Sequence, residues 1–412
     1  MNALTRKFFR HTNRYGFRSA VGRVLNHTNK SLGAAETSKT AVNEVPKKID
    51  VIRHFKNILG HPHGDQQDLA SLDFKLPRYQ WVIPNFGFAS GGHLNIFRFI
   101  NLLSDMGYPQ HLVILPPYEW QNPDKAREAI NKWYFPLRAT LGLGVESFVA
   151  SNFTFATGWQ TAYWVHHHQA SAKKFYFVQD HEPDFSPKSS ESFLAAETYR
   201  LGLTGVTAGS WLKRKLKSEY QMDCHDISFA CDTNFYLPAE KKKKPNFDVV
   251  FYARHSTPRR LFEIGLLALN KFAEGCPELG VIFAGGDVSR YEIPFHHLNA
   301  GELPLNQLPD LYTQCDLALV LSGTNLSLLP LELAACKCPI VLNDIPSANW
   351  LLPRSAAFYA KPTPESLAQA LLKAYKNPKQ RSQKANKAFE IAQSSSWQKE
   401  AQKIVSIVES TK

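Results

Sequence analysis

Hydrophobic and polar positions follow two alternating patterns from residue 79 onward. Residues 79–84 (YQWVIP) form a short apolar run typical of a buried strand, whereas residues 93–106 place apolar side chains three or four positions apart, as on a helix face. A glycine-rich loop joins these segments, and a second strand is predicted at 111–115. Together they predict one βαβ unit of an α/β protein.

Similar units follow in two series. In the first, we predict strands at 147–155, 174–178, 205–208 and 226–230 and helices at 159–165, 191–201 and 211–220. In the second, we predict strands at 248–252, 279–284, 317–321 and 339–342 and helices at 261–272, 306–314, 329–335, 364–375 and 395–408. The pattern predicts two doubly wound, Rossmann-like halves that face a cleft, with ligands at the carboxyl ends of the strands.

Two local features complete this prediction. Ser210 is expected to cap the basic helix at 211–220. The lysine run at 241–244 has a proline on each side and is interpreted as a solvated hinge between the halves, with phosphate or lipid binding as the alternative.

Most of the net positive charge lies at the start of the chain. The 412 residues contain 48 Lys and Arg and 36 Asp and Glu, a net charge of +12. Residues 1–60 hold twelve of these basic residues and three of the acidic ones, so this arm carries +9. The arm is interpreted either as a segment on an anionic membrane surface or as a solvated tail, and a mitochondrial transit peptide would have a similar composition.

Other motifs narrow the class of protein. No apolar run approaches the length of a membrane-spanning helix, and the arm lacks the motifs of nucleic-acid-binding domains. Walker A, H-E-x-x-H and G-x-S-x-G patterns are missing, and two cysteines at the end of one predicted helix make a poor zinc set. All six cysteines follow residue 220 without a C-x-x-C pair, so they are interpreted as core residues in a reducing, cytoplasmic setting.

Two segments suit an anionic ligand. Gly91 and Gly92 stand before a helix, where backbone N–H groups can approach an anion; a tight turn is the alternative. Arg254 and Arg260 follow a strand directly, and their guanidinium groups match the oxygens of a diphosphate. An exposed basic turn is the alternative for this second segment.

Two further segments offer carboxylates. Asp180, His181 and Glu182 follow a strand and form a candidate acid–base or hydroxyl-binding group, with a structural turn as the competing interpretation. Glu332 lies on an apolar helix after a run of small polar residues, where it could bind a ribose diol or be an ordinary partly exposed acid.

The segments ATGWQTAYWV (156–165), YFVQDHEPDF (176–185) and FYARHSTPRR (251–260) resemble those of retaining GT-B glycosyltransferases. Within the large family 4-like group, the chain is most similar to WsaF-type rhamnosyltransferases. The resemblance covers roughly residues 78–400. It implies the GT-B fold, preceded by the basic arm, and transfer with retention of configuration.

The resemblance also implies roles for single residues. The expected diphosphate-binding residues are Arg254, Arg260, Gly91 and Gly92. The expected nucleoside-binding residues are Gly285, Gly286, Leu303 and Glu332. The expected donor-sugar-binding residues are Thr324, Asn325, Leu326, Ser327 and Leu328. Thr324 stands where the family's E-x7-E motif has its first glutamate, so small polar groups and backbone amides are expected to replace that carboxylate.

These implications give one function hypothesis with alternatives. L-Rhamnose is expected to move from dTDP-rhamnose to a polysaccharide or lipid-linked glycan, with Asp180, His181 and Glu182 acting in catalysis and without a metal, a cofactor or a nucleic-acid partner. The alternatives are another nucleotide-sugar donor, an epimerase of the same fold, and a non-catalytic membrane or nucleic-acid binder. The expected parts are the arm (1–60), an acceptor-side domain (61–237), a nucleotide-sugar domain (238–390) and a closing helix (391–412). The expected location is the cytoplasm, with membrane contact at its inner face through the arm.

Overall fold

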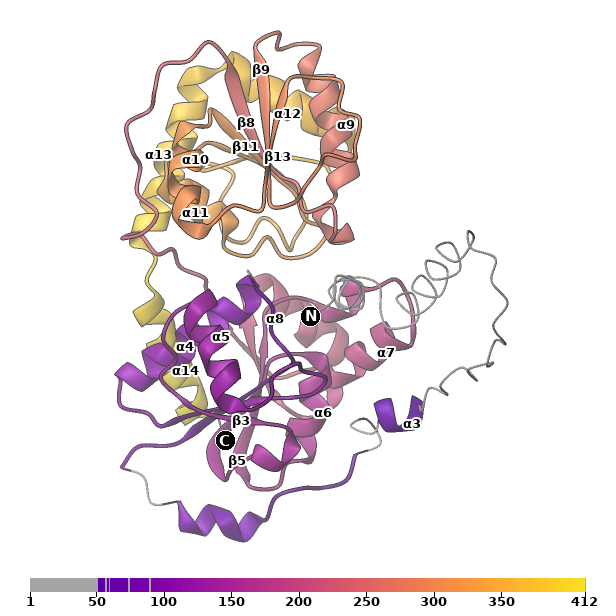
Figure 1. Ribbon diagram of the computed structural model, residues 1–412, viewed down its shortest axis with the longest axis vertical. Coiled ribbons are helices and arrows are strands. Elements are labelled where there is room, and N and C mark those ends of the chain that lie inside the picture. Colours follow the sequence, from indigo (N-terminus) through magenta and orange to yellow (C-terminus); the bar gives the residue numbers. More distant parts are fainter. Residues whose placement is uncertain (1–50, 56–57, 59, 73–74, 89, 412) are drawn as a thin grey trace, which may run out of the picture. The chain divides into compact units, whose positions relative to one another are not determined.

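The computed structural model describes residues 51–55, 58, 60–72, 75–88 and 90–411, and contains two parallel β-sheets in its main part (Figure 1). The arm predicted at residues 1–60 lies almost entirely outside the described residues. Short helical segments, α3 (Val51–His54) and a 3₁₀ turn (Gln66–Ser71), precede the first sheet. No helix in the described part of the chain has the length and apolar character needed to cross a bilayer.

The first sheet has seven strands in the order β3-β2-β1-β4-β5-β6-β7. Its strands are β1 (Tyr79–Ile83), β2 (Gln110–Ile114), β3 (Thr140–Leu143), β4 (Ser151–Ala156), β5 (Ser171–Val178), β6 (Thr204–Ala208) and β7 (Cys224–Ile227). Its helices are α4 (Gly91–Asp105), α5 (Pro123–Trp133), α6 (Trp159–His167), α7 (Ser190–Glu197) and α8 (Ser210–Tyr220). All five residues of β1 are buried, which explains its unbroken apolar spelling, and the Trp81 ring stacks on Phe155 with ring centroids 4.4 Å apart.

The second sheet has six strands in the order β10-β9-β8-β11-β12-β13. Its strands are β8 (Phe247–Tyr252), β9 (Leu279–Ala284), β10 (His297–Gly301), β11 (Leu317–Val320), β12 (Ile340–Asn343) and β13 (Phe358–Ala360). Its helices are α9 (Phe262–Ala273), α10 (Leu308–Gln314), α11 (Leu329–Ala335), α12 (Pro364–Lys376) and α13 (Pro378–Ser394). α9 packs with α12, and α11 packs with α13 (Figure 1).

The strand order reverses at one point in each sheet. In the first sheet β1 lies between β2 and β4, and in the second β8 lies between β9 and β11. Loops diverge to opposite faces at such a point, so the carboxyl ends of these strands leave room for a ligand. The two predicted doubly wound halves are therefore confirmed, and their reversal points lie at the ends of β1 and β8.

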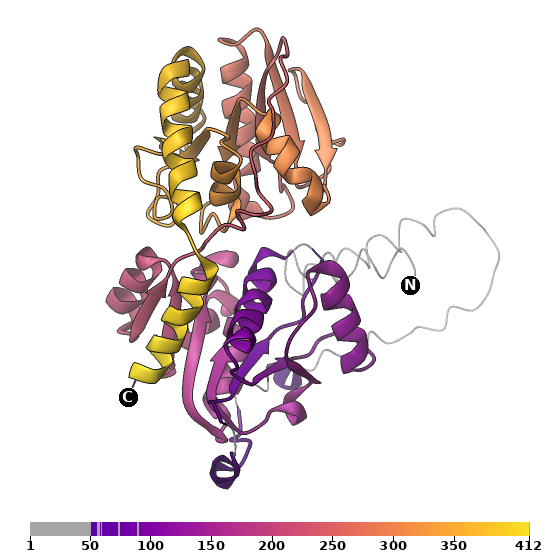
Figure 2. The same cartoon turned by 90° about the vertical axis from the view of Figure 1, so that its left-hand side faces the viewer.

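The last helix returns to the first sheet. α14 (Trp397–Ser410) follows α13 and packs on α4, as Figure 2 shows for the yellow segment. Trp397 meets Phe99 edge-on at 5.6 Å between ring centroids, and the Arg98 guanidinium lies 4.5 Å from the Trp397 ring centroid. The chain's last segment thereby ties the helical layer of the first sheet to the end of the second.

One prediction about local structure is wrong. Ser210 does not cap α8, because the helix begins at Ser210 itself and Gly209 is the N-cap residue with φ of +87°. The lysine run lies in an irregular segment before β8, and residues 241–243 are exposed. Lys241 pairs with Asp316, and Lys244 pairs with both Asp248 and Asp316, while a hinge at this run stays a prediction. The six cysteines, by contrast, are all buried and free, as expected.

Candidate active site

The residues after β5 and those after β11 are joined by hydrogen bonds. The Asp180 carboxylate accepts the backbone N–H of Asn325, with distances of 3.1 Å to Oδ1 and 3.3 Å to Oδ2. The Asn325 side chain donates from Nδ2 to the Gln179 carbonyl at 2.7 Å. Asp180 and Asn325 are 8% and 4% exposed, so these bonds lie in a nearly dry environment that strengthens them. Two predicted groups, one catalytic and one for the donor sugar, therefore meet.

The glycine pair at the start of α4 belongs to the same group of residues. The Gly92 carbonyl accepts the Gln179 Nε2–H at 2.9 Å, and the Gln179 Oε1 accepts from Asn95 Nδ2 at 3.0 Å. A Cβ added to Gly91 would lie 3.5 Å from the Ser327 hydroxyl oxygen. The amino end of α4 thus faces the loop of residues 324–328, where the helix dipole favours a negative ligand.

The predicted diphosphate-binding arginines lie at the carboxyl end of β8. Arg260 donates from Nη1 to the Asn325 carbonyl at 2.9 Å and to the Ser322 hydroxyl at 3.3 Å. Arg254 donates to the Tyr252 hydroxyl at 3.4 Å, and the Arg260 guanidinium lies 5.9 Å from the centroid of the same Tyr252 ring. The two guanidinium groups therefore share a neighbour and can act on one ligand.

A third arginine adds charge to this group. The Arg259 guanidinium lies 4.3 Å from the Phe185 ring centroid, and its buried Nε has no hydrogen-bond partner among the described residues. Burial lowers the pKa of Arg259 to about 10, and the Arg260 charge acts in the same direction. The nearby Asp180 carboxylate raises the pKa of Arg259 and so opposes this effect. One carboxylate does not neutralise the charges of Arg254, Arg259 and Arg260, so this group favours an added anion.

Burial also raises the pKa of the Asp180 carboxyl above its ordinary value. The Thr324 hydroxyl, the Arg259 charge and the His181 backbone N–H act against that rise, because each stabilises the carboxylate. Asp180 differs from His181 and Glu182 in that its carboxylate accepts a hydrogen bond from the loop after β11. Its chemistry is that of a hydroxyl-binding or proton-accepting group.

His181 and Glu182 have different surroundings. The His181 ring lies 3.0 Å from the Tyr220 hydroxyl at Nε2 and 2.8 Å from the Asp184 carboxylate at Nδ1. Glu182 accepts the Trp159 backbone N–H at 2.7 Å and the Tyr176 hydroxyl at 2.7 Å. Burial raises the pKa of Glu182 to about 7. Both contact sets lie among elements of the first sheet, and a catalytic role for these two residues stays a prediction.

The predicted nucleoside-binding residues fall into two places. A Cβ on Gly285, whose φ is +97°, would lie 2.6 Å from the Tyr252 ring, and one on Gly286 would lie 2.6 Å from the Ala253 carbonyl oxygen. Both glycines therefore allow the segment after β9 to approach the end of β8 closely, just before Arg254. Leu303 is partly buried against the large core that also contains Leu326 and Leu328.

Glu332 lies on α11 beside other polar groups. Burial raises its pKa to about 7, while the Tyr236 hydroxyl and the Arg98 charge stabilise the carboxylate. Arg98 comes from α4, so Glu332 interacts electrostatically with the helix that carries the glycine pair. Glu332 thus lies on a different element from Gly285 and Gly286, which directly follow β9.

Sequence reasoning missed several residues of this region. Asn95 is fully buried on the apolar face of α4, and a lone amide among apolar residues was the signal that could have revealed it. Gln179 stood directly before the predicted trio. Trp350 donates from Nε1 to the Asn325 Oδ1 at 3.2 Å, and no local pattern indicated this contact. No group of three His, Cys, Asp or Glu side chains that could hold a metal ion occurs within the residues that the structure describes.

Comparison with known proteins identifies both sequence and structural relatives. Residues 248–372 match the family model described as WsaF, C-terminal domain. The O-antigen biosynthesis protein RfbC of Myxococcus xanthus is 30% identical over 335 residues, which are 79% of this chain and 26% of that protein. The chain thus spans about a quarter of this relative's length.

The structural relatives are more distant in sequence. The Anabaena protein Alr3699/HepE in complex with UDP-glucose has a TM-score of 0.60 at 15% identity, over 81% of this chain and 100% of its own. A TarM variant of S. aureus in complex with UDP has a TM-score of 0.66 at 9% identity, over 81% of this chain and 100% of its own. At such low identity these likenesses show the fold alone, and that fold is the expected GT-B fold.

Proposed function

We propose that this chain, which has the GT-B glycosyltransferase fold and whose residues 248–372 belong to the family of WsaF C-terminal domains, is a glycosyltransferase of polysaccharide synthesis. In this proposal it takes a sugar from a nucleotide sugar and transfers it to a growing glycan. RfbC, the sequence relative from Myxococcus xanthus, has a name that refers to O-antigen biosynthesis, which supports this class of product.

One observation supports the proposal most strongly. The arginine segment at the end of β8 and the 324–328 loop at the end of β11 are joined through Arg260, which binds the Ser322 hydroxyl and the Asn325 carbonyl. A diphosphate held by Arg254 and Arg260 would place the attached sugar toward this loop and toward Asp180. The donor's two parts would therefore contact the two groups of residues that the fold brings together.

The chemistry follows from charge. When the bond between the sugar carbon and the diphosphate oxygen breaks, negative charge grows on the leaving diphosphate. Preorganised guanidinium groups stabilise that charge without reorganisation, and this effect is typically the largest single contribution to such a rate. We expect the reaction to proceed without a metal ion for this reason. The amino end of α4 at Gly91 and Gly92 would add a further partial positive charge.

The sugar side of the reaction is assigned to the buried trio and its neighbours. Asp180 would bind a donor-sugar hydroxyl or the acceptor hydroxyl, and His181 and Glu182 would hold the turn in which it lies. Thr324, Asn325, Leu326, Ser327 and Leu328 would bound the sugar pocket. If the configuration is retained, the leaving diphosphate itself can take the proton of the acceptor hydroxyl.

The finer identity of the substrates is also a proposal. L-Rhamnose carried by dTDP is the favoured donor because of the WsaF-type match, whereas the HepE and TarM structures contain UDP. Gly285, Gly286, Leu303 and Glu332 would hold the nucleoside. Residues 61–237 would receive the acceptor, residues 238–390 the donor, and residues 391–412 would close on the first domain. Residues 1–60 would bring the enzyme to the inner face of a membrane that holds a lipid-linked acceptor.

A ligand panel tests the proposal. Thermal unfolding is measured with dTDP, UDP, GDP and ADP and with their sugar nucleotides, in metal-free buffer. A nucleotide that binds only the folded protein must raise the melting temperature, so one family of nucleotides is expected to give a shift. A control variant, Arg354→Gln, changes an exposed arginine that pairs with Asp344 and should keep the shift.

The outcomes are distinct. The Arg254→Gln variant should lose most of the nucleotide-dependent shift, because it lacks one charged donor to the diphosphate. Absence of any shift in the wild-type protein at millimolar nucleotide would contradict the proposal. A different outcome would indicate the epimerase alternative. In that case a sugar nucleotide would raise the melting temperature, and its sugar would be released without an acceptor or converted to its epimer.

A further inference from the structure

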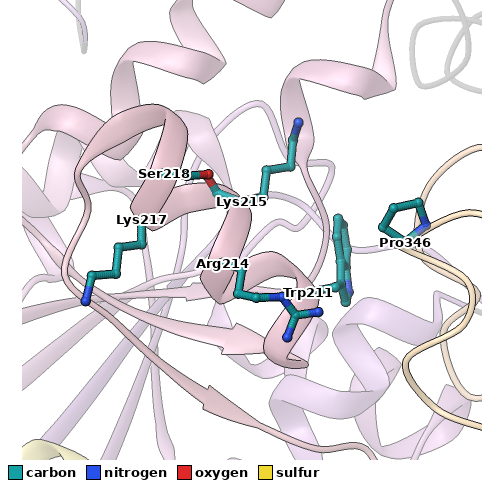
Figure 3. A pocket seen from close by; sticks show the side chains of 6 residues that line it. All are labelled: Trp211, Arg214, Lys215, Lys217, Ser218 and Pro346. Carbon is teal, nitrogen blue, oxygen red and sulfur yellow. The ribbon is translucent and has the colours of Figure 1, made fainter.

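We propose that a basic hollow beside α8 binds the phosphate of a phosphorylated sugar unit in the acceptor, a refinement that rests on the proposed glycosyltransferase function. The hollow has a volume of about 490 Å³ (Figure 3). Its lining residues are Trp211, Arg214, Lys215, Lys217, Ser218 and Pro346. All but Pro346 belong to α8, and Pro346 follows β12.

The charge of the hollow is one-sided. Three of its six lining residues are basic and none is acidic. Arg214 donates to the Ser210 hydroxyl at 3.1 Å, and the described residues include no carboxylate that pairs with its guanidinium. Lys215 alone is partly neutralised, because it pairs with Glu219 at 2.9 Å. Such a site attracts an anion, and a guanidinium group matches the oxygens of a phosphate in particular.

The hollow also has two apolar lining residues, Trp211 and Pro346. Trp211 is 6% exposed and faces Pro346, and the Arg214 side chain extends toward the Trp211 ring (Figure 3). The indole N–H of Trp211 has no hydrogen-bond acceptor among the described residues. A ligand that combines a ring with a phosphate fits these surroundings better than a free inorganic anion, because it can cover the apolar wall while its charge meets Arg214.

One residue links the hollow to the proposed donor site. Trp350 lies four positions after Pro346 and donates to Asn325 in the donor-sugar loop at 3.2 Å. The same ring lies against Gly209, the residue before α8, where an added Cβ would be 2.4 Å from Trp350 Cε3. Trp350 therefore contacts both the donor-sugar loop and the residue that precedes α8, the helix that lines the hollow.

This position distinguishes an acceptor site from a second donor site. The proposed donor diphosphate is assigned to Arg254 and Arg260 at the end of β8, whereas the hollow is lined by residues 211–218 of α8 and by Pro346 after β12. The ligand class that follows is an acceptor with a negative charge on the sugar unit that is held there, rather than a neutral glycan.

Ligand-observed NMR tests this site with glucose 1-phosphate as the probe and free glucose as the uncharged control. The full-length protein is first saturated with the nucleotide that gives the largest thermal shift, so that the donor site is filled. The wild-type protein should bind glucose 1-phosphate and not glucose. The Arg214→Gln/Lys217→Gln double variant should weaken this binding at least tenfold.

A single variant on the same helix controls for folding and for the loss of a positive charge from α8 outside the hollow. Lys213 pairs with Asp226 and does not line the hollow, so Lys213→Gln should bind glucose 1-phosphate as the wild-type protein does. Equal binding by the double variant, or absence of binding by the wild-type protein, would overturn the proposal.

A membrane surface is the other source of phosphate, and vesicles of phosphatidylglycerol distinguish it. If the double variant loses vesicle binding while glucose 1-phosphate fails to bind the wild-type protein, the hollow is a lipid-headgroup site and the acceptor assignment is wrong. Failure of the proposed function would appear separately: no nucleotide would give a thermal shift, and the protein, then tested without nucleotide, would still bind glucose 1-phosphate through Arg214.

Discussion

Asp180 and Glu182 are buried carboxyl groups two positions apart, yet their hydrogen bonds serve different parts of the protein. Asp180 reaches Asn325 in the loop after β11, and Glu182 accepts the first backbone N–H of α6 and a tyrosine hydroxyl. A carboxylate at the start of a helix satisfies an otherwise unpaired N–H and is favoured by the helix dipole. Substitution of Asp180 is therefore expected to affect the loop after β11, whereas substitution of Glu182 is expected to affect the start of α6.

At the residue scale, Arg260→Gln should weaken nucleotide binding. The variant loses the charge that lies between Tyr252, Ser322 and the Asn325 carbonyl, and hydrogen bonds to charged groups contribute about 1.5–3 kcal/mol each. The dissociation constant of the nucleotide identified by the thermal panel should rise roughly 10- to 100-fold in isothermal titration. Arg354→Gln serves again as the matched control, and an unchanged affinity in Arg260→Gln would remove this residue from the diphosphate site.

At the scale of elements, the glycines at the starts of α4 and α8 differ in the substitutions that they tolerate. Gly91→Ala should fold normally, because its added Cβ would meet Ser327 at an ordinary contact distance of 3.5 Å. It should nevertheless weaken nucleotide-sugar binding, since the methyl group would fill space between α4 and the 324–328 loop.

Gly209→Ala should show the opposite behaviour. Its φ of +87° and ψ of 154° suit glycine alone, and the added Cβ would overlap the Trp350 ring. The variant should lose about 1–3 kcal/mol of unfolding free energy in urea titration. Equal stability of the two variants would contradict the assignment of Gly209 as a sterically required residue.

A third prediction at this scale concerns α14. Trp397→Ala should destabilise the protein by about 3–5 kcal/mol, because it removes a buried ring that packs on Phe99 and lies beside the Arg98 guanidinium. Chemical denaturation measures this loss. Gln402→Ala, an exposed position on the same helix, should leave the unfolding free energy within about 0.5 kcal/mol. A similar loss in both variants would show that the buried ring does not make the main contribution of α14 to stability.

The sequence allowed most elements to be predicted because parallel strands are buried on both faces and therefore read as apolar runs. α13 was missed for a physical reason: residues 378–394 bury mainly small side chains, Ala385, Ala388 and Ala392, so their apolar periodicity is weak. α5 and the edge strands β3, β10 and β13 were missed as well. The prediction for Ser210 failed because the sequence does not show whether a serine near the start of a helix is its N-cap or its first residue.

The sequence predicted which segments form the candidate site, but not the hydrogen bonds between them. Strand ends and their polar residues indicated the four segments, because parallel strands place their carboxyl ends at one edge. The bond between Asp180 and Asn325 joins residues 145 positions apart, and the N-terminal contact of Glu182 depends on where α6 begins. Such contacts follow from packing between elements, which no local pattern specifies.

At the scale of the whole molecule, buried carboxyl groups couple the stability of the fold to pH. Burial raises the pKa of Glu182 from an ordinary 4.5 to about 7, and it raises that of Asp180 as well. In unfolded protein Glu182 loses its proton near pH 4.5, whereas in folded protein it keeps the proton until about pH 7. The folded state then binds more protons in this window, so this group lowers the unfolding free energy as pH rises from about 4.5 to 7.

His93 and His168 act in the opposite direction, because burial lowers the pKa of each to about 4. Their contribution to stability rises with pH between about 4 and 6.5, so the wild-type curve alone does not isolate Glu182. Comparison with a Glu182→Gln variant does, since its amide can still accept the Trp159 N–H and can donate to the Tyr176 hydroxyl but carries no titrating proton.

Urea unfolding at pH 5 and pH 8 gives the comparison. From pH 5 to pH 8, the unfolding free energy should rise more, or fall less, in Glu182→Gln than in the wild-type protein. The difference should be up to about 3 kcal/mol, which corresponds to the shift in the pKa of Glu182. Glu263→Gln, an exposed acid on α9, should follow the wild-type curve. If Glu182→Gln also follows it, Glu182 is ionised in the folded protein at pH 5, and the two donors from Trp159 and Tyr176 outweigh the cost of burying its charge.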